Sequence, residues 1–405
     1  MGSRRNLLVA QAGGATAVIN SSLAGVVQAA RASGQFRAIL GARRGIEGVL
    51  RQDLIDLGAQ PPELLQQVAR TPSAALGVTR LRLSPEAAQL ALEVLTRYDV
   101  GAFVYIGGND SAETAHRLSS AAQRAGTPLQ VVVVPKTIDN DLPATDHCPG
   151  YGSIARFMAL ATRDAGLDTE ATAGLYPVKL IEVMGRNAGW VAASTALGKR
   201  EANEAPHRIF FPERPPANLD AFLEEIAAAH QQYGHVVAIV PETLRDAHGR
   251  PLGGEQAQWV DPFGHPYYPG PAPVLAQAIE SRLRLRARVD KPGTIARMFA
   301  ACVSPVDWQE AYDAGTAAVA LLAEGASGVM VSLERVSDEP YQVRFGAVPL
   351  IAVANRERRL PDEFIAPDGR SITEAFRRYA LPLIGGPLPH YARLADLPYR
   401  PQSTT

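Results

Sequence analysis

Residues 131–141 read Val-Val-Val-Val-Pro-Lys-Thr-Ile-Asp-Asn-Asp. Four consecutive β-branched residues are typical of a strand buried within a parallel sheet. The residues that follow the proline include Lys136, Thr137, Asp139 and Asp141. A buried strand that ends in a cation, a hydroxyl and two carboxylates predicts a site that handles phosphate, a metal ion and a proton together.

The segments before this one alternate between strand and helix patterns. Apolar runs predict strands over residues 7–12, 100–106 and 129–134, and amphipathic spacing predicts helices over residues 85–97 and 112–124. This alternation indicates an α/β fold with a mostly parallel sheet.

A second alternating set begins after Pro149-Gly150. Its predicted helices cover residues 153–164, 188–197, 219–230, 273–286 and 310–322, and its predicted strands cover residues 177–183, 236–240 and 328–333. Residues 259–273 are rich in Pro, Gly and Tyr and are expected to form a loop. A chain of 405 residues with two such sets predicts two α/β domains or one large doubly wound unit.

Composition excludes several classes of function. A net charge of −1 argues against a nucleic-acid binder or a membrane-surface protein, and no run of 18 apolar residues predicts a membrane span. The two cysteines, Cys148 and Cys302, cannot form a disulfide framework, so a reducing, cytoplasmic compartment is expected. His116, His147 and Cys148 lack the spacing of zinc ligands and are expected to be structural.

Three predicted strands end in glycine or charge, at Gly13-Gly14, at Gly107–Ser111 and at Lys136–Asp141. Ligands of open α/β sheets bind beyond the carboxyl ends of the strands. Gly13-Gly14 would let backbone N–H groups approach an anion, although a tight turn explains it as well. Gly107–Ser111 adds oxygen ligands, although Asp110 or Ser111 could instead cap the next helix.

The segment Lys136–Asp141 carries the strongest chemical signal. A hydroxyl that attacks phosphorus must lose its proton, so Asp139 could act as the base. Lys136 could neutralise charge on the transferred phosphoryl group, and Thr137 could donate a hydrogen bond. The alternative is a solvated charged turn, which needs no buried strand before it.

Polar residues also follow the strands of the second set. Arg186, in Met184-Gly185-Arg186, and Glu242 suit a polar substrate, although a helix start and a surface carboxylate would explain them too. Arg288 and Arg297 could grip a second phosphate, or could simply lie on the surface. A site between the two α/β halves is the most economical arrangement.

From residue 6 to about residue 335, the chain resembles the phosphofructokinase family. The resemblance rests on motifs in the same order as in the family: Gly13–Asn20, Leu76–Arg80, Gly107–Ser111, Pro135–Asp141, Met184–Arg186, Glu242 and Arg297. It implies two Rossmann-like doubly wound domains with a cleft between them. The implied division is a phosphate-donor domain at 1–143, to which part of 298–345 returns, a sugar-phosphate domain at 144–297 and a C-terminal extension at 346–405.

The resemblance also implies the roles of individual residues. Asp139, Lys136, Asp110 and Thr137 would serve catalysis, Gly14, Arg80, Asp110 and Lys136 would bind pyrophosphate, and Asn109 and Asp110 would bind Mg²⁺. The sugar phosphate would contact Thr137, Ile138, Asp139, Met184, Gly185, Arg186, Glu242, Arg288, Thr294 and Arg297. Family members are homo-oligomers, so a homodimer or homotetramer is expected, with Arg288 reaching a neighbour's site.

Two positions indicate which phosphoryl donor is used. ATP-dependent members of the family have glycine where this chain has Asp110 and Lys136, whereas the pyrophosphate-dependent branch has Asp and Lys. A carboxylate at Asp110 would repel the α-phosphate of ATP, and Lys136 would supply a cation to a smaller, densely charged donor. The resemblance therefore implies reversible phosphoryl transfer from pyrophosphate to the 1-hydroxyl of fructose 6-phosphate, with Mg²⁺.

Two positions depart from the family pattern. Asn109 stands where many members have a metal-binding Asp, and Thr294 replaces a usual Tyr or His in the grip on the 6-phosphate. Sedoheptulose 7-phosphate therefore stays open as an acceptor. An ATP-dependent sugar-phosphate kinase and a non-catalytic sugar-phosphate sensor are the alternative functions.

Overall fold

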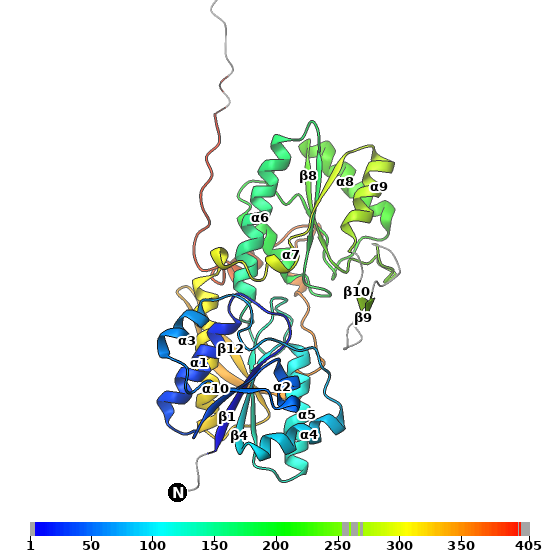
Figure 1. Cartoon of the computed structure of the whole chain (residues 1–405). Coiled ribbons are helices and arrows are strands. Elements are labelled where there is room, and N and C mark those ends of the chain that lie inside the picture. Colours follow the sequence, from blue (N-terminus) through cyan, green and yellow to red (C-terminus); the bar gives the residue numbers. More distant parts are fainter. Residues whose placement is uncertain (1–4, 253–258, 261–265, 268–269, 396, 398–405) are drawn as a thin grey trace, which may run out of the picture.

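A computed structural model describes residues 5–252, 259–260, 266–267, 270–395 and 397. These residues form two lobes, the lower one built around β1 and β4 and the upper one around β8 (Figure 1). Within the described residues, none of the helices is long and apolar enough to cross a membrane.

The lower lobe contains a seven-stranded sheet in the order β13-β12-β5-β4-β1-β2-β3. Its strands are β1 (Asn6–Gln11), β2 (Ile39–Ala42), β3 (Leu54–Asp56), β4 (Val100–Gly107), β5 (Gln130–Pro135), β12 (Val329–Asp338) and β13 (Tyr341–Pro349). The pairings from β12 to β2 are parallel, and the two edge strands are antiparallel to their neighbours. Val131–Val134 are completely buried at the centre of this sheet, because helices cover both of its faces.

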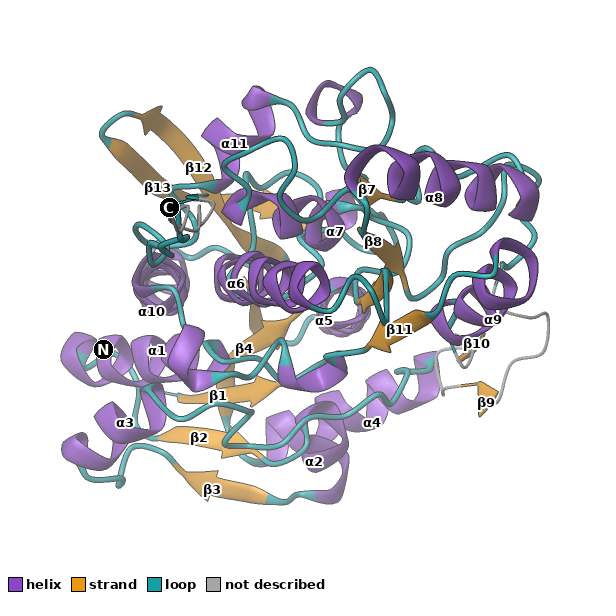
Figure 2. Cartoon of the chain, turned by 90° about the horizontal axis from the view of Figure 1, so that it is seen from above, coloured by secondary structure: helices purple, strands orange, loops and turns teal. Residues whose placement is uncertain are grey.

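Two groups of helices cover the faces of this sheet. One face packs against α1 (Ile19–Ser33), α3 (Pro62–Ala69) and α10 (Pro305–Ala323). The other face packs against α2 (Gly45–Arg51), α4 (Pro85–Arg97) and α5 (Asn109–Arg124). Figure 2 shows α1 and α3 on one side of β1 and β2, with α2 and α4 on the other.

The upper lobe contains a four-stranded parallel sheet in the order β11-β6-β8-β7. Its strands are β6 (Val178–Val183), β7 (Arg208–Ile209), β8 (Val236–Pro241) and β11 (Ala287–Asp290). The helices α6 (Tyr151–Ala171) and α7 (Trp190–Ser194) pack on one face, and α8 (Leu219–Tyr233) and α9 (Ala272–Leu283) pack on the other. The predicted α/β class with two doubly wound sheets is thus confirmed.

The chain crosses between the lobes more than once. After the upper sheet, α10 and β12 return to the lower sheet, and α11 (Glu374–Ala380) then packs into the core of the upper lobe. Short 3₁₀ turns lie at Thr195–Gly198, Gly293–Ile295, Ala300–Cys302, Leu350–Ala352 and Asp362–Phe364. The segment beyond α11 runs beside α6, where Arg163 Nη1 donates to the carbonyl of Pro389 over 2.6 Å.

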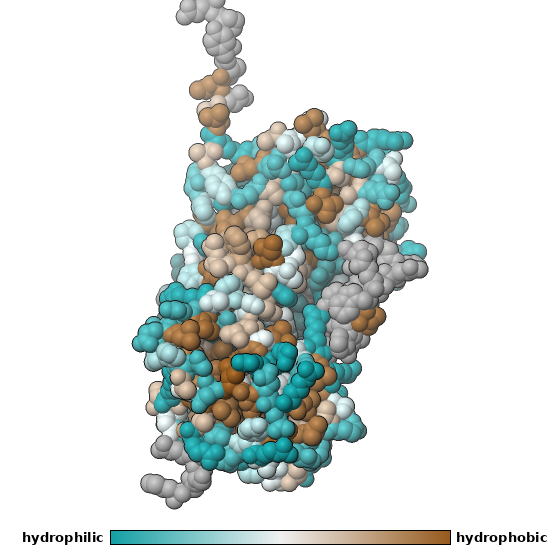
Figure 3. All heavy atoms as spheres, viewed as in Figure 1, coloured by the Kyte–Doolittle hydropathy of each residue, from teal (hydrophilic) through white to brown (hydrophobic). Residues whose placement is uncertain are grey.

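The exposed surface mixes hydrophilic and hydrophobic residues over both lobes (Figure 3). Among the residues whose burial is described, the most exposed large apolar side chains are on the C-terminal segment, where Leu394 is 100% exposed and Leu397 is 84% exposed.

Some predicted elements differ from those observed. Residues 259–273 contain a short antiparallel pair, β9 (Trp259–Val260) and β10 (Pro266–Tyr267), and the start of α9, so a loop over this whole range was wrong. Other residues of that range lie outside the described part. The helix predicted at 188–197 is α7 followed by a 3₁₀ turn, because the hydroxyls of Ser194 and Thr195 bond back to carbonyls three residues earlier.

Helices α1 and α10 approach closely at two glycines, which gives a stability prediction. A Cβ atom on Gly25 would clash with the carbonyl of Tyr312, and one on Gly315 would clash with the carbonyl of Ser22. Because backbone atoms cannot move aside cheaply, Gly25→Ala should lower the free energy of unfolding by about 2 kcal/mol despite its better helix propensity. Urea denaturation measures this change. Gly174→Ala is the control, because a Cβ there meets nothing within 4 Å. A Gly25→Ala protein with the free energy of unfolding of the wild type would show that the two helices tolerate a side chain at this contact.

Candidate active site

The ends of β1, β4 and β5 are neighbours in the sheet, and Lys136 connects two of them. The ammonium Nζ of Lys136 donates to the carbonyl of Gly14 over 2.7 Å. Lys136 is only 2% exposed. A Cβ on Gly13, which has a φ of +75°, would lie 2.9 Å from this ammonium. The glycine turn after β1 therefore makes room for the cation that the end of β5 supplies.

The loop after β4 lies against the same segment. The amide of Lys136 donates to the carbonyl of Gly107 over 3.0 Å. A Cβ on Gly108 would lie 3.4 Å from the carbonyl oxygen of Lys136. Three of the predicted motifs thus meet at one edge of the lower sheet.

Two carboxylates follow Lys136 and are held by one hydroxyl. Thr137 Oγ1 donates to Asp141 Oδ1 over 3.1 Å and accepts from the amide of Asp139, also over 3.1 Å. Ile138 between them is buried. The threonine hydroxyl is therefore engaged in shaping the turn that carries both carboxylates.

Burial and neighbouring charges shift the pKa values of Asp139 and Lys136. Burial, together with the carboxylates of Asp141 and Glu242, raises the pKa of Asp139 to about 8. Burial and, to a smaller extent, Arg297 lower the pKa of Lys136 to about 7, although Asp139 opposes both effects. The site therefore contains an acid and a base that both titrate near neutral pH, as general acid–base chemistry requires.

The upper lobe presents its own strand ends to Asp139. Gly185 and Arg186 follow β6 with φ values of +127° and +43°, and the carbonyl of Arg186 accepts from Thr243 Oγ1 over 2.6 Å. Glu242 follows β8, and its amide donates to the carbonyl of Val183 over 2.9 Å. Burial raises the pKa of Glu242, whereas Arg186 opposes that shift and also lowers the pKa of Asp139.

Arg297 lies beside the glycine turn of the lower lobe. Its carbonyl accepts from the amide of Ala17 over 2.9 Å. A Cβ on Gly14 would come within 2.5 Å of its Nη1 atom. Arg80 is close enough to lower the pKa of Lys136. The predicted phosphate-binding arginines Arg80 and Arg297 therefore gather around the cation at the end of β5.

Two predicted substrate residues have different surroundings. Arg288, in β11, stacks 3.8 Å from the centre of the Tyr176 ring and is 3.9 Å from Asp168. Thr294 is exposed in the 3₁₀ turn Gly293–Ile295. The roles predicted for these two residues stay predictions.

The two predicted metal ligands differ in their surroundings. Asn109 Oδ1 accepts from the amide of Asn355 over 2.9 Å, and Asn109 Nδ2 donates to the carbonyl of Arg356. Asp110 is exposed in the first turn of α5. Among the described residues, no group of three or more His, Cys, Asp or Glu side chains could hold a metal ion. The Asp110 carboxylate and the Asn109 amide oxygen nevertheless fit Mg²⁺, because this ion takes one or two carboxylates from a protein and further oxygens from phosphate and water.

Sequence reasoning missed Glu357 in the C-terminal extension. Its charge raises the pKa of both Asp139 and Asp141, and its Oε2 atom accepts from Asn187 Nδ2 over 3.3 Å. The signal in the sequence was the charged run Arg356-Glu-Arg-Arg359, which follows the apolar residues 347–354.

Comparison with known proteins identifies the family of this chain. Residues 6–322 match the model of the family described as phosphofructokinase, and the chain belongs to this family. The chain is therefore a phosphotransferase with an alcohol acceptor.

The chain is also similar to individual proteins of known activity or structure. The chain is 40% identical to the pyrophosphate–fructose 6-phosphate 1-phosphotransferase of Xanthomonas campestris pv. campestris, over 95% of this chain and 92% of the relative. It is 33% identical to the sulfofructose kinase of Alkalicoccus urumqiensis, over 88% of this chain and 91% of that one. The crystal structure of pyrophosphate-dependent phosphofructokinase from Nitrosospira multiformis superposes with a TM-score of 0.86 at 35% identity and covers 100% of both chains.

The electrostatics of the site predict how Asp139 titrates. Because the Glu242 carboxylate raises the pKa of Asp139, Glu242→Gln should lower that pKa from about 8. Carbon-13 NMR of labelled aspartate carboxyls in wild type and variant measures the shift. Glu363→Gln, which removes an exposed carboxylate, is the control. An equal or higher midpoint in Glu242→Gln would show that the two carboxylates do not interact.

Proposed function

We propose that this protein transfers a phosphoryl group reversibly from pyrophosphate to the 1-hydroxyl of fructose 6-phosphate. The observation that carries the proposal is the buried Lys136 ammonium against the Gly14 carbonyl, with Asp139 three residues further along the chain. A cation and a base at one strand end are what phosphoryl transfer to an alcohol needs. The names of the relatives that span nearly the whole chain support the same reaction.

In this proposal, Asp139 transfers the proton and Lys136 stabilises the charge of the transferred group. The Asp139 carboxylate takes the proton of the 1-hydroxyl as that oxygen attacks one phosphorus of pyrophosphate. The bond from this phosphorus to the bridging oxygen breaks, and inorganic phosphate leaves. Lys136, while protonated, offsets the negative charge on the transferred group. In the reverse direction the protonated Asp139 returns the proton to the 1-oxygen.

The remaining polar residues would bind the two substrates. Gly14 and Arg80 would hold pyrophosphate directly, and Asp110 would hold it through Mg²⁺. Arg186 and Glu242 would hold the sugar. Mg²⁺ would be held by Asp110 with the Asn109 amide oxygen and would neutralise phosphate charge. We also propose that the protein is cytoplasmic and forms a homodimer or homotetramer.

The donor follows from the pair Asp110 and Lys136. Asp110 is exposed at the start of α5, so its carboxylate would repel the extra phosphate of a nucleotide. Lys136 would supply a cation near pyrophosphate, which is a smaller and more densely charged donor. An ATP-dependent kinase is the alternative, and direct competition between the two donors separates the possibilities.

A matrix of donors and acceptors tests this function. Pyrophosphate and ATP are each combined with fructose 6-phosphate, sedoheptulose 7-phosphate and sulfofructose in the presence of Mg²⁺, and the product is measured in both directions. We expect turnover with pyrophosphate and fructose 6-phosphate. Turnover with ATP alone, or binding of sugar phosphate without any turnover, would refute the proposal.

The double variant Asp110→Gly, Lys136→Gly tests the donor pair. Removing the cation should lower kcat/KM for pyrophosphate by about 10²–10³, because charge on the transferred group is no longer offset. Glu113→Gln is the matched control, since Glu113 lies one turn further along α5 and pairs with Arg117 over 2.5 Å. If the double variant keeps the wild-type rate with pyrophosphate, the roles of both residues are wrong.

A further inference from the structure

The C-terminal segment Asn355–Arg358 lies outside the region 6–322 that matches the family model, yet it touches both sides of the site. Asn355 and Arg356 bond to the side chain of Asn109 at the start of α5. The next residue, Glu357, accepts from Asn187 after β6. The segment thus extends from the loop after β4 in the lower lobe to the loop after β6 in the upper lobe.

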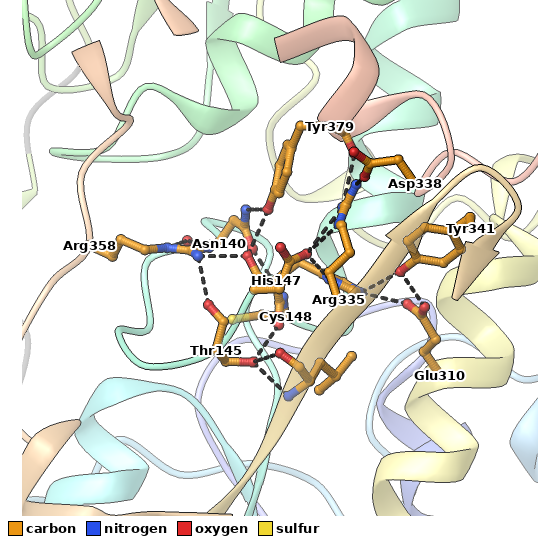
Figure 4. A network of polar contacts seen from close by, with 12 residues as sticks. Asn140, Thr145, His147, Cys148, Glu310, Arg335, Asp338, Tyr341, Arg358 and Tyr379 are labelled. Atoms are coloured by element: carbon orange, nitrogen blue, oxygen red, sulfur yellow. Dashed lines mark hydrogen bonds and ion pairs between the residues drawn. The ribbon is translucent and has the colours of Figure 1, made fainter. Parts of the chain in front are cut away.

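Arg358 bonds to the loop that leaves Asp139 (Figure 4). Its Nε and Nη2 atoms donate to the carbonyl of Asn140 over 3.2 and 2.8 Å. Its Nη1 atom donates to the carbonyls of Thr145 and Asp146 over 2.7 and 2.6 Å. Its backbone amide donates to the carbonyl of Asp141 over 2.6 Å. One residue therefore gathers four backbone carbonyls of a single loop.

The loop needs such support because of Asn140. This residue is completely buried and has a φ of +54°, in the left-handed region that costs a non-glycine residue free energy. Its side-chain oxygen accepts from the amide of Cys148 over 3.0 Å, and its side-chain nitrogen donates to Tyr379 Oη over 2.9 Å. The side chain and the carbonyl of Asn140 are thus both held, directly after Asp139.

The position of Arg358 is itself constrained. Its guanidinium lies 4.6 Å from the centre of the Trp190 ring. Its carbonyl accepts from Trp190 Nε1 over 3.2 Å. Since Trp190 is 1% exposed in the core of the upper lobe, Arg358 ties the loop to a rigid part of that lobe.

The far end of the loop is anchored to the lower lobe without Arg358. Asp146 Oδ2 is 3.1 Å from Arg335 Nη2 and 2.7 Å from His147 Nδ1. His147 Nε2 is in turn 2.6 Å from a carboxylate oxygen of Glu310 in α10. Removing the Arg358 side chain should therefore loosen the part of the loop next to Asp139, where the bonds of the Asn140 side chain and of the Arg358 amide remain. The other end of the loop should stay attached.

We propose that Arg358 is a positioning residue for phosphoryl transfer, which holds the Asp139 carboxylate in place by fixing the backbone from Asn140 to Asp146. The inference rests on the proposed function. A guanidinium presents its N–H donors in a rigid planar fork that reaches several carbonyls at once, whereas a lysine ammonium cannot match this geometry. The charge of Arg358 alone is thus insufficient.

Kinetics of Arg358→Ala and Arg358→Lys test this role. Misplacing a reacting group by about 1 Å costs about 10²-fold, so we expect kcat to fall by about that factor in both variants. The KM for pyrophosphate should change less than about twofold, because Gly14 and Lys136 are untouched. Ethylguanidinium should restore kcat of Arg358→Ala at least about tenfold, whereas ethylammonium should not.

Arg370→Ala is the matched control. Arg370 also makes a bidentate pair, with Glu225 over 2.5 and 2.8 Å, bonds to the carbonyls of Arg214 and Gly369, and stacks on Phe210. It contacts no part of the loop, so its loss should lower stability but leave kcat unchanged.

Wild-type kcat in both Arg358 variants, or a loss no larger than that of Arg370→Ala, would overturn the proposal. Amide hydrogen exchange over residues 139–146 gives a second measurement that needs no turnover. Exchange there should be faster in Arg358→Lys than in wild type, and equal exchange would also overturn it. Absence of turnover in the wild-type protein would instead refute the proposed function, which the exchange result does not depend on.

Discussion

The site depends on one buried interaction, the hydrogen bond from the Lys136 ammonium to the Gly14 carbonyl. Burying a cation costs free energy unless it has polar partners, so the surrounding residues are constrained. Gly13 must lack a side chain because a Cβ would crowd the ammonium. Asp139 and Asp141 favour the charged form of Lys136, while burial and Arg297 oppose it. The resulting pKa of about 7 keeps Lys136 balanced between its two protonation states near neutral pH.

Residues of the upper lobe also affect the protonation of Asp139. Burial and the neighbouring carboxylates raise the pKa of Asp139 to about 8, whereas Arg186 lowers it. Because Arg186 and Glu242 directly follow strands of the other sheet or their turns, the protonation of Asp139 depends on how the two lobes approach each other. The C-terminal extension contributes to the same balance through Glu357, and it supports the loop beyond Asp139 through Arg358.

Much of this arrangement was predictable from local sequence. The valine run identifies a buried central strand, and α4 spans the predicted residues Pro85–Arg97, since Ser84 caps its N-terminus and proline is its first residue. The contacts of Asn109 were not predictable, because its partners Asn355 and Arg356 are far away in the sequence. Nor was the contribution of the extension, whose charged run follows no helix or strand periodicity. Local patterns report strands and turns, whereas contacts between distant loops arise only once the two lobes have packed.

The measurement that tests the central claim most directly is phosphorus-31 NMR of Mg²⁺-pyrophosphate and fructose 6-phosphate with wild type and Asp139→Asn. If Asp139 is the base at a site built around Lys136, the wild type converts the pyrophosphate signal into phosphate and fructose 1,6-bisphosphate. Asp139→Asn should slow this conversion by about 10²–10⁴-fold and still bind pyrophosphate, because Lys136 keeps its contact with Gly14. An Asp139→Asn protein that forms the bisphosphate at the wild-type rate would contradict the account.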